Sequence, residues 1–212
     1  MLFRSLYRVL LGDDHANVAK TLFSLGLVYE TKWEYKESMK YHKEAFRLRR
    51  RLWGNDDISV AESLDKISSL YMKQPNLGKA LQSTKEALRI RTFVHGKGNL
   101  DVATSLFAMG VIFNDIGDTE KAMECYVVSL DIRKEKLGEA SVEVAQTLHN
   151  LGTTYAKVCD YSNALSHWRQ ALGAYRDAGY SDENHLVSIA IGNIKMAENY
   201  QEEQAKLQAT WR

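Results

Sequence analysis

Proline, cysteine and long apolar runs are scarce in this sequence of 212 residues, which holds one proline and two cysteines, Cys125 and Cys159. So little proline favours long helices, because proline breaks a helix interior. Two cysteines exclude a disulfide framework and favour a reducing compartment, so we expect a cytoplasmic location. The first residues are interrupted by arginine too early for a signal peptide, and no apolar run reaches the ~20 residues of a membrane span. We therefore expect no membrane association.

Charge of one sign is not in excess either. The chain has 28 Lys and Arg residues against 27 Asp and Glu residues, a formal net charge of +1. Nucleic-acid-binding proteins usually show a clear basic excess, so we expect no nucleic-acid partner. Hydrophobic residues make up 45% of the chain, which is enough for a continuous core.

Catalytic and metal-binding motifs are also missing. The six histidines are spread along the chain and form no His-x-x-x-His pair, and the two cysteines form no Cys-x-x-Cys pair. Neither a phosphate-binding loop nor a Gly-x-Ser-x-Gly elbow occurs. The sequence therefore predicts a protein that is not an enzyme and has no cofactor and no metal site.

One stretch of the sequence, residues 144–155, recurs every 42 residues. Val144 is preceded at this spacing by Val102, Val60 and Val18, and Leu148 by Leu106, Leu64 and Leu22. Four copies in unbroken register indicate stacked repeats, each of which buries its apolar face against its neighbours.

Each copy contains two helical patterns. In the fourth copy, apolar residues at spacings of four, three and four form one helical face, at Val144, Leu148, Leu151 and Tyr155. A short turn follows, and a second apolar stripe then extends to Tyr175. Small residues at Gly152 and Ala171, and at the equivalent positions of other copies, predict close helix crossings.

These patterns predict an all-α protein, a right-handed α-solenoid of antiparallel helix pairs. The expected division is a half-repeat helix over 1–14, repeats over 15–56, 57–98, 99–140 and 141–181, and a C-terminal capping helix over 182–212. Gly54, Gly96 and Gly138 follow the second helices and predict left-handed helix ends. Three residues later, helix N-caps are predicted at Asp57, Asn99 and Ser141.

One arginine column, Arg49, Arg91 and Arg133, lies in the last turns of the second helices. It has two interpretations. The column is either an exposed basic ridge for an acidic partner or a set of cations at negative helix ends that pair with nearby carboxylates. The second interpretation, pairing with carboxylates, is favoured for the column as a whole. The dense cluster Arg47, Arg49, Arg50 and Arg51 gives more support to the basic-ridge interpretation at that one site.

The repeat resembles the tetratricopeptide repeat, whose pattern is matched in the fourth copy by Leu148, Leu151-Gly152, Tyr155, Ala164, Trp168 and Ala171. The period of 42 and the absence of a proline after the second helix resemble the kinesin light chain subgroup of this family. Its Ala-Leu-x-Ile-Arg helix end is matched by residues 87–91. The resemblance concerns the subgroup of repeat and not the motor subunit itself.

The resemblance implies a concave groove lined by the first helix of each pair. The implied peptide-binding residues are Lys20, Phe23, Ser24, Leu27, Lys66, Lys73, Phe107, Val111, Gln146, His149, Asn150 and Lys157. Asn150 stands at the family's groove asparagine position, where an amide can donate to and accept from a peptide backbone. Phe23 and Phe107 are expected to offer apolar pockets to a short segment with hydrophobic anchors and mixed charges.

The predicted function is a scaffold or adaptor that holds a protein or peptide partner in its concave face. Three alternatives remain open: a motor–cargo adaptor of the kinesin light chain type, a regulatory sensor module, and an oligomerisation piece of a longer protein. The sequence starts inside a second helix, which implies either a fragment of a longer protein or a short cap. We expect a monomer unless the N-terminal apolar face pairs with another copy.

Overall fold

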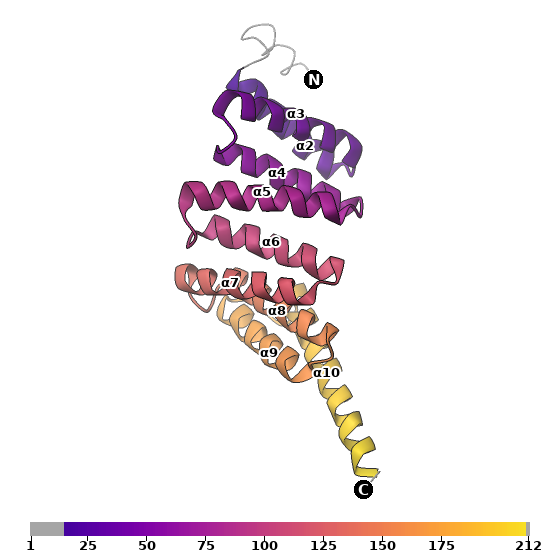
Figure 1. Ribbon diagram of the computed structural model, residues 1–212. Helices are drawn as coiled ribbons and strands as arrows, with labels where there is room; N and C mark the ends of the chain where they lie inside the picture. The colour runs from indigo at the N-terminus through magenta and orange to yellow at the C-terminus, as the bar shows by residue number, and fades with distance from the viewer. Residues whose placement is uncertain (1–14, 211–212) are drawn as a thin grey trace. The chain divides into compact units, whose positions relative to one another are not determined.

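A computed structural model describes residues 15–210, with side chains as far as Leu207 (Figure 1). Within this range the regular structure is entirely helical, as predicted. The helices are α2 (Ala16–Thr31), α3 (Tyr35–Trp53), α4 (Ile58–Lys73), α5 (Leu77–His95), α6 (Leu100–Ile116), α7 (Thr119–Leu137), α8 (Val142–Lys157), α9 (Tyr161–Asp177) and α10 (His185–Thr210). The predicted half-repeat helix over 1–14 lies outside the described residues.

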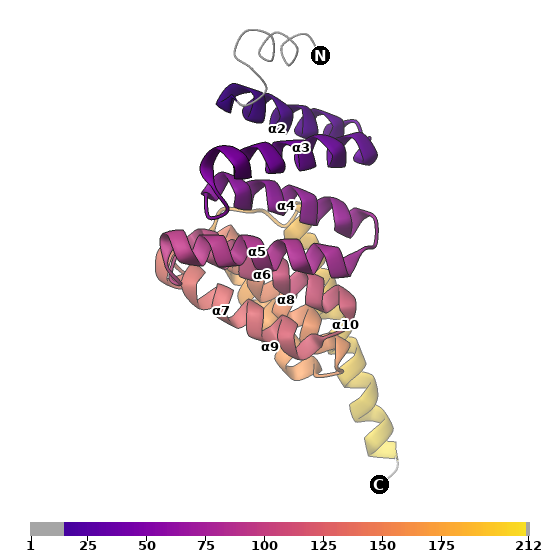
Figure 2. The ribbon, with the colours of Figure 1, turned by 45° about the horizontal axis from the view of Figure 1, so that its top comes forward.

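The chain divides into two compact units, Met1–Ser105 and Leu106–Arg212, and the boundary falls inside α6. In the first unit α2 packs along α3, α3 contacts α4, and α4 packs along α5. Figure 2 shows these four helices as successive layers. In the second unit α7 contacts α8, α8 packs along α9, and α9 contacts α10. The fold is the helical-repeat solenoid that the sequence predicts.

Close crossings hold the helix pairs of the first unit together. A Cβ atom on Gly26 of α2 would lie 2.6 Å from the ring of His42 on α3, so only glycine fits there. The Ser38 hydroxyl donates to the Gly26 carbonyl at 2.9 Å across the same crossing. His42 is fully buried, and this burial lowers its pKa to about 4, so the ring is neutral at pH 7.

The second unit repeats this arrangement with larger rings. Gly110 lies against the ring of Tyr126, and Gly152 lies against the indole of Trp168. Trp168 is 1% exposed, and its Nε1 donates to the His149 carbonyl at 3.1 Å. The prediction that small residues mark the crossings is confirmed, and the aromatic side chain opposite each glycine explains why they must be small.

The junctions between repeats have positive-φ glycines, as predicted, but their geometry is not left-handed helical. Gly54, Gly96 and Gly138 have φ of 89°, 79° and 80° with ψ of 179°, 165° and 169°. This combination is essentially restricted to glycine. The chain therefore leaves the second helix in an extended conformation that only glycine adopts without strain.

All three predicted N-caps are confirmed. The side chains of Asp57, Asn99 and Ser141 accept hydrogen bonds from the backbone N–H groups of Ser59, Asp101 and Val144. His15 stands 42 residues before Asp57 and caps α2 through its Nδ1, which accepts from Asn17 at 3.1 Å. A histidine N-cap is unusual and was not predicted from the sequence, although the repeat register places His15 in the N-cap column.

The last helix, α10, begins after Asn184, whose side chain accepts from the Leu186 N–H at 2.9 Å. Its inner stripe consists of Val187, Ala190, Ile194 and Ala197, all buried. Leu186, near the start of the helix, is half-buried, and Val187 takes the fully buried position. Beyond it, residues 202–207 are exposed, which fits the wet outer face expected of a capping helix.

Among the described helices, none is both long enough and apolar enough to span a membrane.

Candidate functional site

The residues that the resemblance places in the groove lie on four helices, the first of each pair. In the first unit α2 carries Lys20, Phe23, Ser24 and Leu27, and α4 carries Lys66 and Lys73. In the second unit α6 carries Phe107 and Val111, and α8 carries Gln146, His149, Asn150 and Lys157. The relevant surface is therefore the face of the first helices in each unit, named here the first-helix face.

Neighbouring first helices lie side by side within each unit. In the first unit, Lys66 of α4 forms an ion pair with Glu30 of α2 at 3.7 Å. In the second, the Nζ of Lys157 on α8 donates to the Asn114 carbonyl of α6 at 2.9 Å. Both contacts bridge successive repeats, so the outward residues of adjacent first helices share one surface.

The predicted groove residues differ in how far they reach solvent. Lys20, Ser24, Lys73 and Lys157 are exposed, and the other eight are half-buried. The accessible part of the first-helix face is therefore mainly polar and basic, with partial apolar exposure at Leu27 and Val111.

Phe23 and Phe107 contribute to packing more than the sequence predicts. The guanidinium carbon of Arg49 lies 4.2 Å from the Phe23 ring centroid, and that of Arg133 lies 4.6 Å from the Phe107 centroid. Phe23 also meets the ring of His42 edge-on at 5.1 Å. Because an arginine covers one face of each ring, these phenylalanines leave less open apolar surface than an empty pocket would.

The arginine column is buried, so an exposed basic ridge at Arg49, Arg91 and Arg133 is ruled out. These residues are 6%, 7% and 5% exposed. Each crosses a repeat junction and donates to a hydroxyl on the next first helix, at 3.0, 2.5 and 2.7 Å. The acceptors are Ser63, Ser105 and Thr147, which are themselves 42 residues apart. This hydroxyl column is the sequence signal that could have shown that the arginines point inward.

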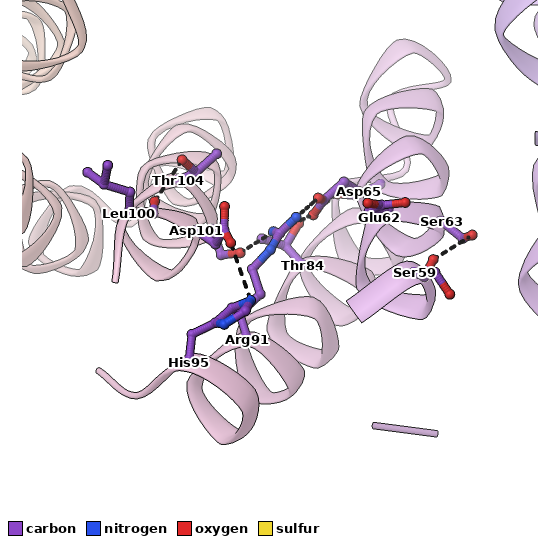
Figure 3. Close-up of polar contacts among 12 residues, drawn as sticks. Ser59, Glu62, Ser63, Asp65, Thr84, Arg91, His95, Leu100, Asp101 and Thr104 are labelled. Carbon is purple, nitrogen blue, oxygen red and sulfur yellow. Dashed lines mark hydrogen bonds and ion pairs between the residues drawn. The ribbon is translucent and has the colours of Figure 1, made fainter. Parts of the chain in front are cut away.

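Arg91 differs from Arg49 and Arg133 in the side chain that faces its guanidinium group. Asp65 stands at the repeat position that Phe23 and Phe107 occupy in the other two cases. Figure 3 shows Arg91 directed at the carboxylate of Asp65, with which it forms two hydrogen bonds. Burial raises the pKa of Asp65, and the hydrogen bond and charge of Arg91 oppose that rise. Nearby, His95 lies 3.4 Å from Asp101 and links the end of α5 to the start of α6. The carboxylate pairing predicted by the second interpretation is thus present, but inside the repeat stack.

His149 sits between α8 and α10. Its Nε2 lies 3.4 Å from the Nδ2 of Asn193. Burial lowers the pKa of His149, so the ring is neutral at pH 7 and can accept from the amide. The adjacent Asn150 is half-buried on the same helix. This part of the first-helix face is therefore uncharged and able to hydrogen-bond.

Lys73 lies over two aromatic rings of the α2–α3 turn, 6.0 Å from the Trp33 centroid and 5.1 Å from the Tyr35 centroid. Trp33 is 76% exposed and has a φ of 62°, which is unfavourable for a bulky residue. A hollow of about 720 Å³ adjoins it, lined by residues 33–37 and Gln74. Sequence reasoning placed Lys73 on the first-helix face but missed these partners.

A second hollow, of about 840 Å³, lies between α3 and α5 and was also missed. It is lined by Phe46, Arg50, Asn55, Asp56, Val60, Gln82, Lys85, Glu86 and Arg89. The arginine cluster near residue 50 was the available signal for this site. Over residues 15–210, no group of three or more His, Cys, Asp or Glu side chains is placed to hold a metal ion.

The sequence matches two models of the tetratricopeptide repeat family, over residues 18–59 and 57–135. Together these matches span more than half of the 212 residues. No curated protein matches the sequence significantly.

Solved structures of helical-repeat proteins resemble this chain in fold. BtubC (BKLC) from P. vanneervenii is 19% identical, with a TM-score of 0.72 over 98% of this chain and 86% of that one. A putative kinesin light chain with nearly identical TPR-like repeats from Podosopora anserina is 12% identical, with a TM-score of 0.75 over 92% of each chain. The apo form of RapI is 19% identical, with a TM-score of 0.73 over 87% of this chain and 49% of that one.

The 42-residue register, the glycine–ring crossings and the family matches agree. The chain belongs to the tetratricopeptide repeat family, and its fold is similar to that of kinesin light chain-like repeats.

Proposed function

We propose that this protein is a non-enzymatic scaffold whose first-helix face binds an extended segment of a protein partner. Tetratricopeptide repeats are in general protein-interaction modules, and family membership supports that broad role. The further assignment of the binding site to the first-helix face depends on which polar side chains that face exposes. The low cysteine content supports a cytoplasmic setting for this scaffold.

The observation that carries the proposal is the set of polar side chains on the first helices of each unit. Lys20 and Ser24 are exposed on α2, and Gln146 and Asn150 are partly exposed on α8. Each unit therefore presents donors and acceptors on a surface made rigid by helix packing. Such a surface suits an extended peptide, whose backbone needs both donors and acceptors.

The charges on this face indicate the character of the partner. Lys20, Lys73 and Lys157 are exposed. In the second unit, α8 also carries the neutral amides of Gln146 and Asn150 and the uncharged His149. A partner segment with some acidic residues and small apolar anchors is complementary to this surface. Lys73 already contacts two rings and Lys157 a carbonyl, so Lys20 is the lysine best placed to meet such a segment.

Affinity capture with the full chain as bait tests the proposal. Two variants alter the first-helix face without removing a described packing contact: Lys20→Glu with Ser24→Glu, and Gln146→Glu with Asn150→Ala. The matched control changes exposed residues of a second helix, Glu124→Ala with Asp131→Ala. All variants are first checked by circular dichroism for native helix content.

We expect at least one first-helix variant to lose partners that the wild type and the control both recover. Equal recovery by all four proteins would contradict the proposal, because it would place the partner on another surface.

A further inference from the structure

The hollow between α3 and α5 contains a fixed cation. The Nε of Arg50 donates to Oδ1 of Asn55 at 2.8 Å, and its guanidinium carbon lies 5.3 Å from the Phe46 ring centroid. The hydrogen bond and the ring hold the guanidinium in place while its Nη groups remain available. Another, smaller hollow adjoins the α3–α5 hollow and is lined by Arg47, Arg50, Arg51 and Asn55. Arg50 and Asn55 line both hollows and join them.

The opposite wall is a closed ion-pair network. Arg89 of α5 donates to Asp56 at 2.6 Å and to Glu86 at 2.9 and 3.0 Å. Both carboxylates of the hollow therefore already have a cation partner. Arg89 is shared by the two carboxylates, and Lys85 also lines the hollow, so this wall has two cations for its two anions. The positive charge of Arg50 is therefore not offset by this wall.

The other repeat junctions show what is unusual about Arg50. Lys134 stands in the same column two repeats later, and it pairs with the carboxylate of Glu139 at 3.0 Å. Arg176 stands in the column one repeat further, and it pairs with Asp182 at 2.9 Å. At the first junction the corresponding partner is the neutral amide of Asn55. Within residues 15–210 neither Arg50 nor the exposed Arg47 has an ion-pair partner.

The fold does not require these arginines. The next junction carries Thr92 where the first has Arg50, and the third carries Asp131 where the first has Arg47. The chain thus builds the same junction without them. A pair of uncompensated guanidinium groups beside a hollow of about 840 Å³ therefore points to a ligand that brings the missing negative charge.

We propose that the α3–α5 hollow binds an acidic segment of a protein partner, with a carboxylate on Arg50 and Arg47 and an adjacent apolar side chain on Phe46. Phe46 is half-buried and lines the hollow together with the fully buried Val60, so the Phe46 side chain offers apolar contact beside the cation. A peptide supplies both features in one chain. This surface is formed by the second helices and is separate from the first-helix face.

The chemistry favours a peptide over a nucleic acid. The net charge of the chain is +1, whereas nucleic-acid binding depends on several phosphate contacts from a wide basic surface. Two arginines next to an apolar floor instead match one carboxylate and its neighbour, with charge-assisted hydrogen bonds of the guanidinium–carboxylate type.

The test measures fluorescence anisotropy with the full chain and a short fluorescein-labelled peptide of glutamate and leucine. The same peptide with glutamine in place of glutamate is the ligand control. The variant Arg50→Thr with Arg47→Asp carries residues that the chain itself uses at these columns, so it is expected to fold. Lys134→Thr makes the same change at a junction where the cation is already neutralised. A single-stranded oligonucleotide of equal charge tests the alternative ligand.

We expect the glutamate peptide to bind, the glutamine peptide to bind at least about tenfold more weakly, and the Arg50→Thr/Arg47→Asp variant to lose at least about tenfold in affinity. Lys134→Thr is expected to bind as the wild type does. In the Lys20→Glu/Ser24→Glu background, which alters the first-helix face, the Arg50→Thr/Arg47→Asp change is expected to cause the same loss of affinity. The second comparison separates this site from the first-helix face.

No binding of the glutamate peptide, equal binding of the two peptides, an unchanged affinity in the arginine variant, or tighter binding of the oligonucleotide would each overturn the proposal.

Discussion

The helix crossing at Gly152 offers a direct test of the repeat packing. Substitution by alanine adds one methyl group, and its carbon would lie 2.6 Å from Cδ1 and 2.7 Å from Nε1 of Trp168. It would also lie 3.0 Å from the carbonyl oxygen of Ala164, which is backbone. An ordinary carbon contact is about 3.5–4.0 Å, so the indole or the helix must move.

The structure limits where the indole can go. Trp168 is 1% exposed, and its Nε1 is hydrogen-bonded to the carbonyl of His149. Forcing a methyl group into a packed core costs about 1–3 kcal/mol, and losing a hydrogen bond adds about 1 kcal/mol. Alanine recovers about 0.5–1 kcal/mol over glycine through helix propensity. The expected net loss of stability for Gly152→Ala is about 2 kcal/mol.

Gly173 provides the matched control in the same unit. It lies in α9, is exposed, and a Cβ atom there would meet nothing within 4 Å. Only the propensity gain applies, so we expect Gly173→Ala to stabilise the protein by about 0.5–1 kcal/mol. Urea denaturation followed by circular dichroism measures both variants against the wild type. If Gly152→Ala shifts the midpoint upward as Gly173→Ala does, the crossing is not packed as described and the reasoning fails.

Three further predictions concern buried charge and backbone. The free energy of unfolding should fall by about 3 kcal/mol as the pH drops from about 6.5 toward 4, because His42 takes up a proton only in the unfolded state over this range. His42→Tyr removes this titration, so the urea midpoint should depend less on pH between these values. An unchanged pH dependence in the variant would contradict the assignment. Asp65→Asn should destabilise the protein by about 2 kcal/mol because it leaves the buried Arg91 without its anion. Glu62→Gln should cost under about 1 kcal/mol in the same denaturation assay, because the Glu62 side chain is 51% exposed. Equal losses of stability in the two variants would refute this distinction. Gly96→Ala should cost about 1–3 kcal/mol because of its φ of 79°, whereas Gly98→Ala should be nearly neutral, and the reverse order of midpoints would contradict the backbone geometry.

The repeat and the helix ends could be predicted from sequence because their signals are local and periodic. The valine column at Val18, Val60, Val102 and Val144 specifies a buried helical position in every copy, and all four are at most 3% exposed. N-caps act within three residues of their own position, so Asp57 was identifiable without any knowledge of tertiary contacts.

The burial of the arginine column could not be assigned in the same way. Arg49 and Arg133 lie near helix ends, and a position near a helix end is compatible with both an outward and an inward side chain. Their acceptors lie on the next repeat, about ten to fourteen residues further along the chain. Only the spatial stacking of one repeat on the next shows that the guanidinium groups are enclosed.

The candidate sites were only partly accessible to sequence reasoning for a related reason. The resemblance to the tetratricopeptide repeat implied Lys20 and Ser24 as groove residues, and helical periodicity agrees with their outward position because it separates outward positions from the apolar stripe. The hollow next to Arg50 depends on how α3 and α5 are spaced, and no pattern within either helix encodes that spacing. The contrast between Asn55 and the carboxylate of Glu139 becomes meaningful only once both are seen facing their cations.

Site-specific photocrosslinking tests the central claim most directly, which is that the first-helix face receives the protein partner. A photoreactive residue is placed at Ser24 or Gln146 on first helices, and at Asp131 or Gln170 on second helices, and each protein is irradiated with the captured partner. We predict covalent adducts from the positions on α2 and α8 and none from those on α7 and α9. Adducts confined to the second-helix positions would contradict the account.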